Sequence, residues 1–281
     1  MIPALRKPAD AAFFRHRRRP KYLALAALAI QQRFAYRSNV ALDLVVNLAQ
    51  LVAQMYLWRN VFANTPQVGS YDLARMQTYI LVSYVVSSIT FSFVVFMVID
   101  LIRTGGIATV LTRPIDFMYA QLTEALGDAV VRGAVSLVIA VLLSMLFFHA
   151  SLPASPAAGL LFSVSLILSF LVRVTFDFCI SLFACYTLNG RGLHWIQWGV
   201  VSIFSGALIP LEFFPDWLKT IAALLPFQAI VSAPLNIYLG NVQGAAAWMA
   251  IGSQAFWVSV LWLLGRLLLR PSLQALEIQG G

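Results

Sequence analysis

MQTYILVSYVVSSITFSFVVFMV, the run of residues 76–98, contains no charged side chain. A helix needs about 20 such residues to cross roughly 30 Å of hydrocarbon at about 1.5 Å per residue. The run therefore predicts a membrane-spanning helix. Its composition is typical of the chain, since 60% of the 281 residues are hydrophobic and only 11% are charged, whereas soluble domains average about 25% charged residues. We expect one all-α integral membrane domain over residues 1–281.

Apolar stretches on both sides of this run predict six spans in all. Residues 1–38 form a basic arm with an interfacial helix, residues 39–270 the six-span domain, and residues 271–281 a cytoplasmic tail. A secretory signal over 11–30 is the alternative for the arm, but cleavage would leave Arg33 and Arg37 outside. The longest polar interruption is 101–128. The predicted spans are 40–62, 76–98, 134–148, 158–188, a stretch from Leu193 that is interrupted at Pro210, and 246–264.

The distribution of basic residues predicts the orientation. The chain has 19 Lys and Arg against 11 Asp and Glu, and nine of the basic residues precede position 38. With the N-terminus inside, 15 basic residues lie at cytoplasmic segments and three, Arg59, Arg75 and Lys219, lie outside. By the positive-inside rule, both ends are expected on the cytoplasmic side of the cell (inner) membrane. The arm suits anionic lipid headgroups, and no nucleic-acid partner is expected.

Two charges fall inside the fourth predicted span. Arg173 and Asp177 are four residues apart, so they share one helix face and are able to pair. Charges in hydrocarbon cost about 2.5–3.5 kcal/mol each on insertion scales, which makes them candidates for function. Alternatively, the pair has only a structural role and fixes this helix against a neighbouring one. The sequence pattern does not decide between a functional and a structural role. Cys179 and Cys185 are six apart and are expected to be small buried hydrophobic residues.

Residues 205–240 combine apolar composition with Pro210, Pro215, Pro226 and Pro234. Each proline inside a helix removes a hydrogen bond and clashes with the preceding turn, so one continuous helix is excluded. Broken backbone at membrane depth is tolerated where it is buried in protein or lines a cavity. We expect a re-entrant pair of short helices at the outer face, with an amphipathic surface loop as the alternative.

The motifs in this segment and in the second predicted loop resemble those of one family. SGALIPLEFFPDWL (205–218), LPF (225–227) and the run from Pro234 to Gly240 are similar to the outer re-entrant hairpin of membrane subunits of type-2 ABC exporters. IRTG (102–105) and LTRP (111–114) resemble the cytoplasmic coupling helix of the same subunits. Gly106 departs from the pattern, because relatives often carry an acid there.

This resemblance implies a transmembrane (permease) subunit of an ATP-driven exporter. Two membrane subunits, either two copies or two homologues, would pair, and separate ATPase subunits would carry ATP and Mg²⁺. Spans one, two and five would line most of the path. The implied residues for ATPase coupling are Arg103, Gly105, Arg113, Pro114 and Asp116. The implied residues of the outer gate are Pro210, Glu212, Phe213, Phe214, Pro215 and Pro226.

Catalytic motifs are missing from the sequence. No GxxxxGK[ST], HExxH or GxSxG occurs, and His16, His149 and His194 fall in three separate segments. We therefore expect no enzyme activity and no cofactor in this chain. The alternatives to an exporter subunit are an ion-coupled secondary carrier that uses Arg173 and Asp177, and a membrane scaffold without transport. The pattern does not specify the substrate.

Overall fold

A computed structural model describes residues 21–35, 37–148, 150–186 and 190–279. These residues form helices joined by short loops, with a single isolated bridge between Val68 and Tyr71. Residues 1–20 of the basic arm, His149 and residues 187–189 lie outside the described part. Five helical stretches are long and apolar enough to cross a membrane, namely Ala41–Asn64, Leu73–Arg103, Phe117–Phe148, Pro156–Tyr186 and Ala245–Ala275.

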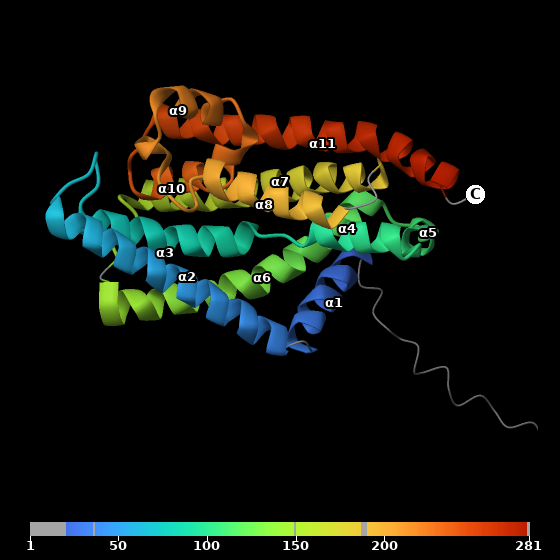
Figure 1. Cartoon of the computed structure of the whole chain (residues 1–281), viewed down its shortest axis with the longest axis horizontal. Coiled ribbons are helices and arrows are strands. Elements are labelled where there is room, and N and C mark those ends of the chain that lie inside the picture. Colours follow the sequence, from blue (N-terminus) through green and yellow to red (C-terminus); the bar gives the residue numbers. More distant parts are fainter. Residues whose placement is uncertain (1–20, 36, 149, 187–189, 280–281) are drawn as a thin grey trace, which may run out of the picture.

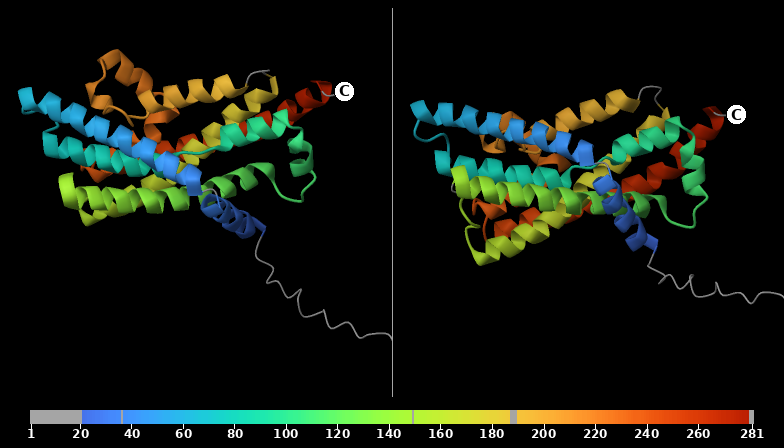
Figure 2. Two further views of the ribbon diagram at one scale, coloured as in Figure 1. Left: turned by 60° about the horizontal axis from the view of Figure 1, so that its bottom comes forward. Right: turned by 90° about the horizontal axis from the view of Figure 1, so that it is seen from below.

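The helices run side by side along the long axis of the molecule (Figure 1). Helix α5 (Gly106–Leu111) and the end of α11 (Ala245–Gln279) lie at one end of this bundle. Helix α9 (Asp216–Ala223) and the turn between α2 (Arg37–Asn64) and α3 (Leu73–Thr90) lie at the other. Helix α1 points away from α2 below the bundle (Figure 2). The long helices are α1 (Lys21–Ala35), α2 (Arg37–Asn64), α3 (Leu73–Thr90), α4 (Val94–Arg103), α6 (Phe117–Leu143), α7 (Pro156–Leu182), α8 (Gly190–Phe204) and α11 (Ala245–Gln279).

The second predicted span is not one helix, because 91–93 interrupt it between α3 and α4. Phe91 adopts an extended backbone, and the hydroxyl of Ser92 accepts a hydrogen bond from the backbone N–H of Val94 at 3.2 Å. This side-chain bond replaces a helical one and starts α4. The guanidinium of Arg132 lies over the rings of Phe91 and Phe93, at 4.7 and 4.6 Å. Apolar composition alone does not reveal such a break.

Two further boundaries differ from the sequence-based expectation. Helix α6 begins at Phe117 instead of Ala134, because Asp116 caps it by accepting from the N–H of Tyr119 at 3.1 Å. Its last turn is a π-helix, η1 (Ser144–Phe148). Residues 271–279, which were expected in the cytoplasmic tail, continue α11 through Pro271 to Gln279. Asp128 and Arg132 do not end the helix, because they pair with each other and Asp128 also pairs with Arg33 of α1.

The stretch after α7 is also more broken than a plain span. A short 3₁₀ turn, η2 (Phe183–Tyr186), follows α7, and α8 has 15 residues. Helix α8 is therefore shorter than the five apolar helices above, and a sixth span is not established. Residues 205–240 form four short helices where the prolines exclude a continuous one. They are η3 (Leu211–Phe213), α9 (Asp216–Ala223), η4 (Pro226–Ala229) and α10 (Ser232–Tyr238).

The core has two main parts. One packs α2 and α3 against residues 227–235 and includes the fully buried Met76, Val86 and Leu235. The other packs α4, α6 and α7 around Val98 and Phe178. Cys179 and Cys185 are free and buried, as expected. The first part supports one wall of a cavity, and the second supports the helices that carry the α4–α5 turn.

Candidate functional site

A cavity of about 540 Å³ lies between α2, the α3–α4 break and α8. Helix α2 presents a polar stripe to it, made of Asp43, Asn47, Gln50 and Gln54. Their spacing of four, three and four residues places them on one helix face. The adjacent stripe of α2 is buried in the core through Leu51, Met55, Trp58 and Phe62.

The opposite walls of the cavity are built by the same helical spacing. Helix α3 contributes small hydroxyl groups, among them Ser83, Ser87 and Thr90. Helix α8 contributes Trp195, Trp198 and Ser202, and the broken segment contributes Phe91 and Phe93. The cavity thus has amides on α2, hydroxyls on α3 and α8, and aromatic rings on α8 and the broken segment. Polar stripes of this kind are costly on spanning helices unless they face water or protein, so the cavity accounts for them.

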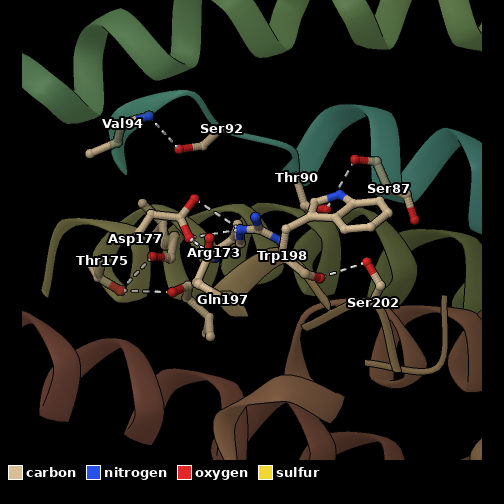
Figure 3. A network of polar contacts seen from close by, with 12 residues as sticks. Ser87, Thr90, Ser92, Val94, Arg173, Thr175, Asp177, Gln197, Trp198 and Ser202 are labelled. Carbon is tan, nitrogen blue, oxygen red and sulfur yellow. Dashed lines mark hydrogen bonds and ion pairs between the residues drawn. The ribbon is translucent and has the colours of Figure 1, made fainter. Parts of the chain in front are cut away.

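Beside the cavity, a buried polar network joins α7 to α8 beneath the α3–α4 break (Figure 3). The Nε–H of Arg173 donates to both carboxylate oxygens of Asp177 at 2.9 Å. The amide of Gln197 on α8 donates to the same carboxylate at 2.6 Å. Asp177 is fully buried and Arg173 is 6% exposed. The pair is therefore closed by a third side chain that the sequence pattern did not single out.

A second charged cluster, which the sequence-based analysis missed, ties α1, α2 and α6 together. Arg33 contacts Asp128 at 2.5 Å and Asp43 at 3.3 Å, and Arg132 contacts the same two carboxylates at 2.7 and 3.7 Å. Both guanidinium groups lie over the ring of Phe93 in the broken segment. Two positive and two negative charges neutralise each other here. Only the Asp128–Arg132 pair was visible in the sequence, as a four-residue spacing.

The residues implied for ATPase coupling surround the short helix α5 (Gly106–Leu111). Arg103 ends α4, and Gly105 caps α5 with a left-handed φ of 72°. Arg113 and Pro114 are exposed, and Pro114 accepts a hydrogen bond from Lys21 at 3.3 Å. Within the described part of the chain, no hydrogen bond occupies the side chains of Arg103 and Arg113.

Asp116 has a different environment from the other residues of this set. Its carboxylate pairs with Arg266 of α11, so it links the start of α6 to the end of the last helix. Burial alone would raise the pKa of Asp116, but hydrogen bonds from Arg266 and from the backbone of Tyr119 lower the pKa below its usual range. The group is charged at neutral pH and is already partnered.

Two of the residues implied for the outer gate pack beside the α2–α3 turn, and none of the six is among the residues that line the cavity. Glu212 accepts from the hydroxyl of Ser70 at 2.8 Å, and the ring of Phe213 packs between Trp58 and Tyr71 with centroids 5.5 and 5.6 Å away. These contacts join residues 211–213 to the α2–α3 turn. Pro210 and Pro226 are buried, while Phe214 and Pro215 lead into α9.

Helix α3 also holds the start of this outer segment. The hydroxyl of Ser83 donates to the carbonyl of Ala207 at 3.1 Å, and that of Tyr79 donates to the carbonyl of Gly206. Gly206 has a φ of 83°, which favours glycine, so the chain is able to turn directly after α8. Near Ser83 and Ala207, the cavity is therefore bounded by side-chain contacts to a broken backbone.

Comparison with known proteins agrees with this architecture. The model of the family described as ABC-2 family transporter protein matches residues 48–280, which include most of the cavity lining, α5 and residues 205–240. No curated protein matches the chain. Among the described residues, no group of His, Cys, Asp and Glu could hold a metal ion. The match covers most of the chain, and the chain therefore belongs to the ABC-2 transporter family, as a multi-pass membrane transport component that is not itself catalytic.

Proposed function

We propose that this protein is the transmembrane subunit of an ATP-driven exporter and that its main cavity is half of the substrate path. The observation that carries the proposal is the lining of the cavity by α2, α3 and α8, which correspond to predicted spans one, two and five. Asn47 and Gln50 on α2 are exposed, although they lie on a helix long enough to cross a membrane. A second membrane subunit against this face, either a copy or a homologue, would enclose the path.

The proposed topology has six crossings of the cell (inner) membrane, with both ends on its cytoplasmic side. Helix α8 spans only about 22 Å at about 1.5 Å per residue, short of roughly 30 Å of hydrocarbon. Residues 205–215 would complete this crossing, and the following short helices would form the outer re-entrant hairpin. The charge distribution supports the orientation, since Arg59, Arg75 and Lys219 lie at the end opposite α5.

The proposed coupling surface is the turn around α5. Arg103 and Arg113 are exposed cations without side-chain partners in the described part of the chain, and they flank a six-residue helix. An ATPase subunit that carries acidic groups in a cleft would bind them, and ATP and Mg²⁺ would reside on that subunit. The Asp116–Arg266 pair would pass a push on α5 to α6 and α11 together.

Co-purification with an ATPase tests this proposal. The chain is co-expressed with the ATPase subunit encoded nearest to it, and the complex is isolated through a tag on the membrane subunit. The double variant Arg103→Glu/Arg113→Glu should lose the ATPase, because two cations become anions at the docking surface. The matched control Arg59→Glu/Lys219→Glu makes the same charge change at the other end and should retain it.

Reconstituted vesicles provide the second arm of the test. The complex should hydrolyse ATP in a vanadate-sensitive manner, and the docking variant should not. Equal ATPase retention by the docking and control variants would contradict the coupling surface. Transport by the isolated chain driven by an ion gradient would contradict the exporter proposal itself.

A further inference from the structure

A second cavity of about 430 Å³ lies among α1, α2, α4 and α6, at the α5 side of the main cavity. Helix α6 lines it with Gln121, Glu124 and Asp128, which are spaced three and four residues apart and share one face. Leu42 of α2 and Met97 of α4 also line it, and they are 65% and 39% exposed. Since both residues lie in stretches long and apolar enough to span a membrane, the cavity opens toward lipid.

Two polar groups in this cavity have no partner in the described part of the chain. Gln121 is 3% exposed, and its amide oxygen is buried without a hydrogen bond. The carboxyl group of Glu124, one turn further along α6, receives no hydrogen bond or ion pair from the described residues. Asp43 and Asp128 differ from them, because Arg33 and Arg132 already neutralise both. Buried polar groups are normally hydrogen-bonded, so an unpaired amide beside an unpaired carboxyl points to a ligand that donates.

The charge of the lining restricts the class of ligand. Arg33 and Arg132 neutralise two of its three carboxyl groups, Asp43 and Asp128, so Glu124 is the uncompensated charge among the lining residues. An anionic headgroup would meet net negative charge. A quaternary ammonium carries no N–H and could not satisfy the amide oxygen of Gln121. A primary ammonium carries three N–H donors and one positive charge, which suits one carboxylate and one amide oxygen.

We propose that this cavity binds the primary ammonium of an aminophospholipid, such as phosphatidylethanolamine, from the leaflet on the α5 side. Helix α1 supports a lipid as the source, since Leu23 and Phe34 are 62% and 68% exposed and Ala29 and Gln32 of the same helix line the cavity. The acyl chains would leave past Leu42 and Met97. The ammonium would lie between Glu124 and Gln121 and would fill the space between α1 and α4. This site is independent of the proposed transport function.

Native mass spectrometry of the whole purified protein tests the site. The protein is presented with equal amounts of phosphatidylethanolamine, phosphatidylcholine and phosphatidylglycerol in one micelle. The ethanolamine lipid should be retained preferentially. Glu124→Gln and Gln121→Leu should each lower that preference by about tenfold, since each removes one of the two acceptors. The matched control Asp216→Asn removes a fully exposed carboxylate on α9 and should leave the preference unchanged.

Two further arms make the result decisive. Glu124→Lys should reverse the preference toward phosphatidylglycerol, an outcome that misfolding does not produce. Free ethanolamine at millimolar concentration should not displace the lipid, because it lacks the acyl contacts. Equal retention of ethanolamine and choline lipids would overturn the proposal, as would unchanged selectivity in Glu124→Gln and Gln121→Leu. Displacement by free ethanolamine would overturn the assignment to a lipid.

Discussion

The buried Arg173–Asp177 pair allows a quantitative prediction. The substitution Asp177→Asn keeps the shape of the side chain and removes its charge, which leaves the guanidinium of Arg173 in a site that is 6% exposed. Removal of one partner of a buried ion pair costs about 3–5 kcal/mol, because the remaining charge is uncompensated. Since whole domains are stable by only about 5–15 kcal/mol, Asp177→Asn should lower the free energy of unfolding by about a fifth or more.

A triple variant separates a structural role from a functional one. Arg173→Met/Asp177→Leu/Gln197→Leu removes all three polar partners and replaces them with apolar groups of similar size. Replacement of a buried pair by packed apolar residues is often neutral, so the triple variant should unfold within about 1 kcal/mol of the parent. If the network only holds α8 on α7, the triple variant should also keep ATPase stimulation in the complex.

Equilibrium unfolding in mixed micelles measures both effects. Tryptophan fluorescence is a suitable signal, because Trp198 lies beside the network in Figure 3. The reasoning is refuted if Asp177→Asn unfolds within about 1 kcal/mol of the parent. It is also refuted if the triple variant is as unstable as the single one. A stable triple variant without ATPase stimulation would instead show that the pair is functional.

Three other predictions follow from single positions. Gly127→Ala should destabilise the protein by more than Gly133→Ala. The added Cβ would lie 2.6 Å from the backbone oxygen of Ala26 at the first site, but 2.7 Å from the movable side chain of Ile89 at the second. Thermal unfolding measures both variants, and equal effects would contradict the packing of α1 on α6. Gly105→Ala should lower the free energy of unfolding by about 1 kcal/mol through its left-handed φ alone, since no atom lies within 4 Å of the added Cβ. It should also weaken ATPase binding in the co-purification assay, whereas the control Gly192→Ala, in a helix, should not. Thr112→Cys should react with an impermeant thiol reagent only from the cytoplasmic side, and Lys219→Cys only from outside. The background labelling should be low, because Cys179 and Cys185 are 3% and 1% exposed. Labelling of both variants from one side would contradict the topology.

Much of the architecture was predictable because it depends on local composition. The long apolar runs predicted the spanning helices, and four prolines predicted the broken outer segment. Boundaries were less predictable where side chains pair. Helix α6 begins at Phe117 because Asp116 caps it and because Asp128 and Arg132 neutralise each other, so its polar first half is still helical. The break at 91–93 had no signal in an apolar run.

The sequence by itself determined the class of the protein, since length and hydrophobicity decide whether a segment is able to leave water. It also placed Arg173 and Asp177 on one face, because helical spacing is a local property. Only the tertiary structure decided which groups from distant segments meet. Gln197 reaches Asp177 from another helix, and Arg33 reaches Asp128 across α1 and α6. The physical reason is that ion pairs and cavities depend on distances between helices, and no periodicity within one helix encodes those distances.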